Sequence, residues 1–348
     1  METGSPTYTG HGPREENGEP TAKKPRFSIP TASHGRHREI GLMRWRSEQD
    51  AASFVGSASG IHFIRSVYSA VESENSRAPS PTQTPEQNLV PGEEDQLPQT
   101  DQERSAKALW QPHEIYSNPS STTKVSFSDL VNWSQSYFDN WHATHPFLHA
   151  PGVLQSFKKI STVPIASIER HVATLDLAIV RSVLSISVAD HRQSIKPHNA
   201  PRIPAVLLFD SFEAATESVQ GTLSVPTTLK ILQAAISVQL FLISMLRHNA
   251  ASRLGGLVVR MMYQIGLHRC PVRYASFPVE DIQLRKRVFW TVYGIDRYLC
   301  QSLGLPLGIR DDDIDVCYLD NERHDPKPGI ELGKSLQQRQ MHNVANGV

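Results

Sequence analysis

The stretch PTTLKILQAAISVQLFLISMLR, from Pro226 to Arg247, decides the fold of this chain. It is apolar on most faces of a helix, and its few polar interruptions are Lys230, Gln233 and Gln239. Lysine and glutamine are each costly in hydrocarbon, which argues against a membrane span. The stretch therefore predicts a central core helix that other helices surround.

On both sides of this stretch, apolar residues recur at spacings of three and four. Ser126, with Asp129 three residues later, predicts the capped start of a helix. Amphipathic stripes then cover residues 130–141, 172–186, 254–265 and 288–303. We find no sustained period-two alternation. The sequence therefore predicts an all-α fold, an irregular multi-helix domain preceded by a disordered N-terminal arm.

Composition excludes several classes of protein. The 348 residues carry 35 basic and 35 acidic side chains, so no global field would hold nucleic acid and a DNA contact would need a local patch. Three scattered cysteines cannot form a disulfide scaffold and fit a reducing compartment. No signal sequence follows Met1, and no run of 18 uncharged apolar residues occurs. We expect a soluble intracellular protein without a membrane partner.

Composition also divides the chain into five segments. Residues 1–50 are polar and interrupted by prolines, which predicts a disordered arm, and residues 51–72 predict a short helical island. A linker rich in proline, glutamine and acid covers residues 73–108, the helical domain residues 109–330, and a disordered tail residues 331–348. In the arm, Lys23, Lys24 and Arg26 fit a nuclear import signal and a solvated charge run about equally well.

An acidic cluster in the last part of the chain offers an enzymatic alternative. Asp311, Asp312 and Asp315 spell the D-D-x-x-D arrangement with which all-α isoprenoid synthases hold magnesium. The run follows Pro306 and Gly308, however, and no second acidic motif appears after it. These three aspartates and Asp313 between them need no ligand to explain them, because acidic residues are favoured at turns and helix starts. A magnesium-dependent, isoprenoid-synthase-like enzyme is therefore the alternative to a non-catalytic regulator.

Three histidines, His142, His145 and His149, lie at spacings of three and four. On one continuous helix they could share a transition metal. Pro146 opposes that geometry because it drives the preceding residue out of helical conformation. We expect a helix end here, with the histidines as satisfied polar groups.

The cysteines do not predict a site either. Cys270, Cys300 and Cys317 are separated by 30 and 17 residues, unlike any compact zinc site, and none has a local signature of a reactive thiol. We expect no metal, cofactor or catalytic residue in this chain.

A basic run, Arg285, Lys286 and Arg287, opens one of the amphipathic stripes. Three residues on different sides of one helix are too few for a nucleic-acid surface. We expect one of the arginines to pair with a carboxylate and the others to be solvated.

Three motifs follow one another along the last helices. A helix ends in Gly-Leu-His-Arg, the next carries arginines, an aromatic pair and an Asp-Arg step, and a Gly-x-Pro turn then precedes an aspartate-rich segment. Their residues are Gly266, Leu267, His268, Arg269, Arg285, Arg287, Phe289, Trp290, Asp296, Arg297, Gly304, Pro306, Ile309, Asp311, Asp313, Ile314 and Asp315. In this order they resemble the regulatory (middle homology) domain of fungal zinc-cluster transcription factors, of the xylanolytic activator type. The likeness covers residues 125–319, and Leu305 departs from it where arginine is commonest.

The resemblance implies a non-enzymatic regulator of transcription in the nucleus. It implies transcriptional coregulators as partners, and DNA contact through an N-terminal module in which six cysteines bind two zinc ions, often as a homodimer. The 348 residues contain no six-cysteine array, so zinc is expected only if such a module belongs to the full-length protein. We expect a lost upstream exon rather than a regulator without its own DNA reader.

Overall fold

The computed structural model describes residues 41–46, 51–75, 109–116, 123–193, 202–274, 277–319 and 321–324. Most of the predicted arm and linker, the tail, and the basic run at Lys23, Lys24 and Arg26 lie outside these residues. The described part is mainly helical with two small sheets, which confirms the predicted fold class. In that part, no helix is long and apolar enough to cross a membrane.

The helices and strands follow one another in a simple order. The helices are α1 (Gly60–Asn75), α3 (Phe127–Ser136), α4 (Ala150–Thr162), α5 (Ile168–His171), α6 (Thr174–Gln193), α7 (Phe212–Gln220), α8 (Leu229–Ser244), α9 (His248–Gln264) and α10 (Val279–Leu303). Strands β1 (Leu42–Arg46) and β2 (Ala51–Val55) pair antiparallel, and β3 (Ile115–Tyr116) and β4 (Ile203–Pro204) pair parallel.

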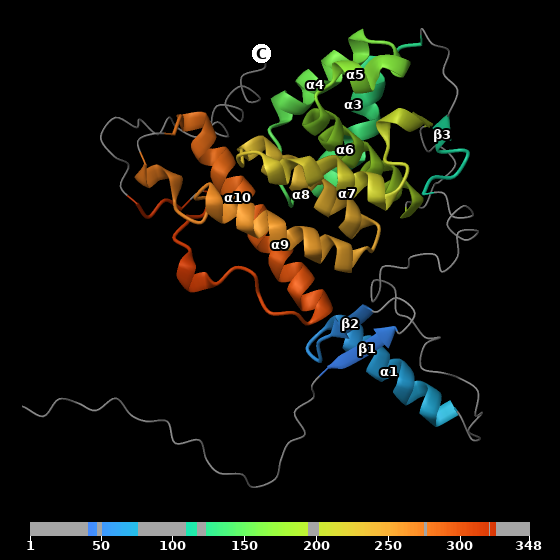
Figure 1. The fold of residues 1–348 in the computed structure, drawn as a ribbon, viewed down its shortest axis with the longest axis vertical. Helices are drawn as coiled ribbons and strands as arrows, with labels where there is room; N and C mark the ends of the chain where they lie inside the picture. Colours follow the sequence, from blue (N-terminus) through green and yellow to red (C-terminus); the bar gives the residue numbers. More distant parts are fainter. Residues whose placement is uncertain are drawn as a thin grey trace, which may run out of the picture. The chain divides into compact units, whose positions relative to one another are not determined.

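Helix α8 is the centre of the core. It contacts α6, α7, α9 and α10, and Figure 1 shows it between α6 and α9. Every residue from 231 to 243 is buried, so no side of this segment faces water. Both glutamine amides donate inside the protein, Gln233 to the carbonyl of Phe147 at 2.8 Å and Gln239 to that of Ala251 at 3.1 Å. The buried Oε1 of Gln239 has no hydrogen-bond partner within the described residues. The prediction of a central core helix is confirmed.

The entry to the domain also follows local sequence signals. The Ser126 hydroxyl accepts the backbone N–H of Asp129 at 3.0 Å and caps α3, as the sequence predicts. A π-helical turn, Tyr137–Trp141, continues the helix. The chain leaves helical structure before Pro146, which agrees with the conformational limits of proline.

Residues 109–116 join the domain without forming a helix, although the predicted helical domain begins at residue 109. Glu114 is buried there and forms an ion pair of 2.5 Å with Arg192 at the end of α6. Burial alone would raise the pKa of Glu114, but the hydrogen bonds from Arg192 and from the backbone of Gln111, together with the nearby positive charges, outweigh burial and lower this pKa. A buried, paired carboxylate thus ties the segment down.

The β1–β2 hairpin differs from prediction, because β1 lies within the segment expected to be disordered and the sequence predicts no strand. A two-stranded hairpin is marginal by itself and needs packing. Here Val55 and Ile61 form a small buried cluster with Leu303 at the end of α10. The N–H of Gly56 also donates to the carbonyl of Leu303 at 2.9 Å. These contacts join residues far apart in the sequence, so no local pattern indicates them.

The close approach at the end of α10 gives a testable prediction. Gly304 has a φ of 69°, and a Cβ there would lie 2.5 Å from the Cα of Gly56. Gly266 has a φ of 70° but open space around it. Both Gly304→Ala and Gly266→Ala should incur a left-handed cost of about 1–2 kcal/mol. Gly304→Ala should lose about 1 kcal/mol more, since it also displaces the hydrogen bond from Gly56.

Urea unfolding of the two variants and the wild-type chain measures this difference directly. Equal losses of unfolding free energy in the two variants would contradict the contact between Gly56 and Gly304.

Candidate functional site

Asp296 of α10 organises the loop that follows this helix. Its carboxylate accepts the backbone N–H of Gly308 at 3.1 Å and that of Ile309 at 3.3 Å. A Cβ at Gly308 would lie 2.6 Å from the carboxylate, so the close approach requires glycine. The Asp-Arg step on α10 thus holds the segment after the Gly-x-Pro turn through backbone hydrogen bonds.

Arg297 extends the same network to the aspartate-rich segment. Its guanidinium donates to the carbonyl of Ile309 at 2.8 Å and to Asp311 at 2.5 Å. It also lies over the ring of Tyr293 at 4.2 Å, and the Tyr293 hydroxyl donates to Asp311 at 2.9 Å. Burial and this hydrogen bond raise the pKa of Tyr293. The motifs do not include Tyr293, but it lies one turn before Arg297 on the same face, a spacing that could have indicated it.

Asp315 connects the aspartate-rich segment to the end of α9. Its carboxylate accepts the N–H of Cys270 at 2.7 Å and forms an ion pair with Arg273, and Arg269 lies 4.0 Å away. The N–H of Asp315 donates to the carbonyl of His268 at 3.2 Å. The structure therefore brings the first and third motifs together.

The Gly-Leu-His-Arg motif is a helix end. Gly266, in left-handed conformation, follows α9, and Leu267 is buried. The ring of His268 contacts that of Tyr263 edge-on at 5.0 Å. Burial, followed by the charge of Arg269, lowers the pKa of His268, so the ring is mainly neutral at pH 7.

The aromatic pair on α10 fixes the chain beyond the loop. Phe289 is fully buried, whereas Trp290 is partly buried and donates its indole N–H to the carbonyl of Cys317 at 3.1 Å. The Trp290 ring also stacks on Tyr318 with centroids 4.3 Å apart. Together with Asp296 and Arg297, this pair makes α10 the scaffold for residues 304–318.

The basic run differs from prediction, because the lysine and not an arginine forms the ion pair. Lys286 is 1% exposed and pairs with Glu322. Arg285 lies over the ring of Phe277 at 3.9 Å, and Arg287 is partly buried. The expectation of two solvated basic residues is wrong because the start of α10 is covered by residues 277 and 322, which sequence periodicity does not reveal.

The three histidines lie where the chain leaves the π-helical turn. Within the described residues they are not a group whose ligand atoms could share a metal ion. Burial lowers the pKa of His142 and of His145. The buried Nδ1 of His142 lacks a hydrogen-bond partner, which corrects the expectation that every histidine here is satisfied.

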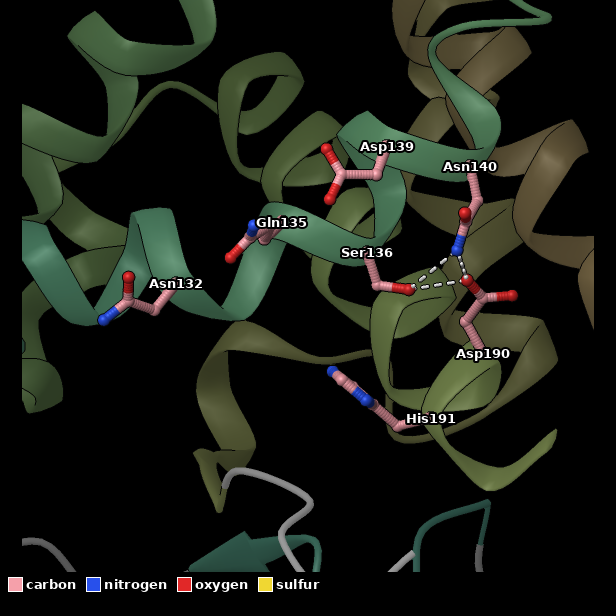
Figure 2. A pocket seen from close by; sticks show the side chains of 7 residues that line it. All are labelled: Asn132, Gln135, Ser136, Asp139, Asn140, Asp190 and His191. Atoms are coloured by element: carbon pink, nitrogen blue, oxygen red, sulfur yellow. Dashed lines mark hydrogen bonds between the residues drawn. The ribbon is translucent and has the colours of Figure 1, made fainter. Parts of the chain in front are cut away.

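A polar hollow of about 460 Å³ lies between α3 with the π-helical turn after it and the end of α6 (Figure 2). It is lined by Asn132, Gln135, Ser136, Asp139, Asn140, Asp190 and His191. The carboxylate of Asp190 accepts hydrogen bonds from Ser136 at 2.5 Å, Asn140 at 2.7 Å and Trp141 at 3.3 Å. The Ser136 hydroxyl thus links α3 to α6 through Asp190.

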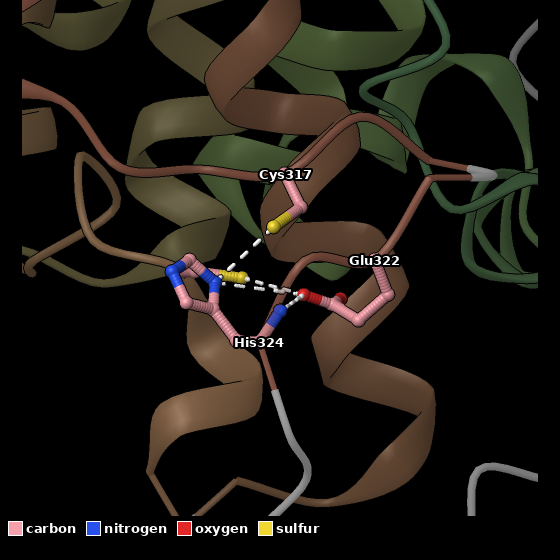
Figure 3. Close-up of side chains that lie close together, drawn as sticks. Cys317, Glu322 and His324 are labelled. Carbon is pink, nitrogen blue, oxygen red and sulfur yellow. Dashed lines mark hydrogen bonds and ion pairs between the residues drawn. The ribbon is translucent and has the colours of Figure 1, made fainter.

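A second cluster was not indicated by the sequence. Four side chains that could bind a metal ion lie close together beside the start of α10, namely Cys270, Cys317, Glu322 and His324. Figure 3 shows the last three pointing toward one another. Burial and the adjacent Glu322 raise the pKa of Cys317 to about 11. Burial opposes ionisation of Glu322, but hydrogen bonds from Cys317 and Lys286 outweigh it and hold its pKa at about 2. The cysteines are too far apart in sequence for spacing to reveal this group.

Comparison with known proteins gives consistent results. A family described as "Fungal specific transcription factor domain" matches residues 134–343. The chain is 32% identical over 308 residues to the probable transcription factor FUP6 of Fusarium proliferatum, which is 83% of this chain and 42% of that protein. It is 25% identical over 178 residues to the transcriptional activator protein acu-15 of Neurospora crassa, 51% of this chain and 18% of that protein.

An ABC-transporter-regulating transcription factor of Aspergillus fumigatus is 26% identical over 192 residues, 54% of this chain and 20% of that protein. The chain thus spans less than half the length of each of these relatives. No solved structure matches it significantly.

The network around Asp296 yields a second prediction. Asp296→Ala should leave the N–H groups of Gly308 and Ile309 without their acceptor, which should lower the unfolding free energy by about 1–3 kcal/mol. Amide hydrogen exchange at these two residues should become faster. Asp312→Ala is the matched control, since Asp312 is exposed and should change stability by less than about 0.5 kcal/mol. Unchanged exchange in Asp296→Ala would refute the role of this carboxylate.

Proposed function

This chain belongs to the fungal specific transcription factor domain family, and we propose that it regulates DNA-templated transcription in the nucleus as the regulatory domain of a larger protein. The observation that supports this best is that the three sequence motifs, all within the matched residues 134–343, form one connected network around α10. The relatives are also named as transcription factors or transcriptional activators.

The proposal assigns DNA recognition to a different module from this chain. The family resemblance places zinc in a six-cysteine module, and the chain has three cysteines, so its residues do not fit that module. Exposed Asp311, Asp312 and Asp313 on the loop would also repel phosphate. We propose that a zinc module outside this sequence reads DNA, in a homodimer, and that this chain contacts transcriptional coregulators.

The geometry supports a non-catalytic role. Asp311 pairs with Arg297, and Asp315 pairs with Arg273 and accepts the N–H of Cys270. These two carboxylates are thus engaged by different cations, and Asp311 also accepts the Tyr293 hydroxyl whereas Asp315 accepts a backbone N–H. The magnesium-dependent synthase alternative requires them to converge on the same ion with Asp312, and this structure gives it no support.

A reporter assay tests the regulatory function. With the full chain fused to a heterologous DNA-binding domain in a fungal reporter strain, transcription should differ from that with the DNA-binding domain alone. Arg297→Ala should shift the output toward the DNA-binding domain alone, because it releases Ile309 and Asp311 from α10. Asp312→Ala should retain the wild-type output.

Output equal to that of the DNA-binding domain alone would contradict the proposal. Magnesium-dependent turnover of a prenyl diphosphate by the purified chain would instead support the enzyme.

Nuclear import is tested separately with a fluorescent fusion of the full chain. Replacing Lys23, Lys24 and Arg26 together by alanine should lower the ratio of nuclear to cytoplasmic fluorescence, because import receptors recognise short basic runs. The control replaces Arg36 and Arg38, which lie in a looser basic stretch, and should leave the ratio unchanged. An unchanged ratio in the triple variant would assign the run to solvated charge.

A further inference from the structure

Four side chains capable of binding a metal converge beside the start of α10. Cys270 comes from the turn after α9, and Cys317, Glu322 and His324 come from the segment after the aspartate-rich loop (Figure 3). Their ligand atoms are two thiol sulfurs, one carboxylate oxygen and one imidazole nitrogen, all within 4.8 Å of one another. Each ligand type is one that zinc takes in proteins.

Three distances between these ligand atoms are close to the edge lengths of a tetrahedral zinc site. Cys270 Sγ lies 3.6 Å from Glu322 Oε1, and His324 Nδ1 lies 3.6 Å from the same oxygen. Cys317 Sγ lies 3.1 Å from His324 Nδ1. Metal–ligand bonds of about 2.0–2.3 Å imply tetrahedral edges of about 3.3–3.8 Å. These three edges therefore need shifts of a few tenths of an ångström to match a zinc site, and the remaining pairs lie within 4.8 Å.

We propose that Cys270, Cys317, Glu322 and His324 bind one Zn²⁺ in a tetrahedral structural site. On binding, each thiol loses its proton to solvent and becomes a thiolate ligand, and the imidazole binds in its neutral form. Two sulfurs and one nitrogen favour zinc over magnesium or calcium, which prefer oxygen ligands. The site lies outside any six-cysteine module and replaces our expectation from sequence that this chain holds no metal.

Groups next to the four ligand side chains also form hydrogen bonds with them. Lys286 pairs with Oε2 of Glu322 and leaves Oε1 directed at the other ligands. The backbone N–H of Arg323 donates to Cys317 Sγ at 3.2 Å, the kind of hydrogen bond that stabilises a thiolate. Such contacts orient ligands before the metal arrives.

Charge balance accounts for the burial of a lysine. Zn²⁺ with two thiolates, one carboxylate and a neutral imidazole carries a net charge of −1. The ammonium of Lys286, only 1% exposed, brings the group to neutrality. A neutral assembly avoids the large cost of burying an unbalanced charge.

The location indicates a structural role for the ion. Cys270 and Cys317 belong to a small buried cluster with Val272 and Ile282, separate from the main core. So few apolar side chains contribute little burial energy, whereas a structural zinc contributes its binding free energy to folding. The ion would fasten the residues that carry Cys317, Glu322 and His324 to the end of α9 and to α10.

The experiment uses the full chain purified under reducing conditions, and its third cysteine provides the control. We expect about one equivalent of zinc per chain by elemental analysis. Cys270→Ser and Cys317→Ser should lose this zinc. Cys300→Ser should keep it, because Cys300 lies on α10 and is not part of the cluster. Co²⁺ added to the metal-free chain should give the thiolate charge-transfer band and the visible bands of a tetrahedral site.

A further variant keeps the test decisive if the serine variants do not fold. The side chain of His324 is 27% exposed, so His324→Gln should fold, with its helical content checked by circular dichroism. It should raise the zinc Kd by at least about tenfold. An unchanged Co²⁺ spectrum in His324→Gln would overturn the proposal. Equal zinc in the wild type and in Cys317→Ser would overturn it as well.

Discussion

The complete burial of α8 is the constraint on which the rest of the domain depends. A helix with no face toward water must be enclosed, and α6, α7, α9 and α10 enclose it. Its glutamine N–H groups have to find acceptors inside the protein, and they do so on the carbonyls of Phe147 and Ala251. The positions of α9 and α10, and therefore of every motif on them, follow from this enclosure.

Helix α10 then turns a packing element into a scaffold for irregular chain. Its apolar face packs on α9, while Asp296, Arg297 and Trp290 hold the loop that follows. Read in isolation, the aspartates of the loop suggest a magnesium site and the arginines of α10 suggest a DNA contact. In the structure, Arg297 and Asp311 bind each other and so help to hold the loop. The family motifs thus describe how one loop is attached to α10 and to the end of α9.

Features with local physical causes could be predicted from the sequence. The cap at Ser126, the core helix and the interruption at Pro146 each depend on neighbours a few residues away. The sequence indicates the network around Asp296 only through the Asp-Arg motif. It does not indicate the hydrogen bonds that this motif makes. The ion pair of Lys286 with Glu322 joins residues 36 apart, and the hydrogen bond of Cys270 with Glu322 joins residues 52 apart. Periodicity and spacing carry no information about such contacts.

The hydrogen bond between Gly56 and Leu303 has a consequence for synthesis of the chain. The β1–β2 hairpin leaves the ribosome long before the end of α10, which supplies its packing partner. During that interval Phe63 and Tyr68 of α1, exposed even in the finished fold, and Val55, buried only later, face the cytosol together. Until α10 is made, Val55 and Ile61 therefore lack the side chain of Leu303, with which they form their buried cluster.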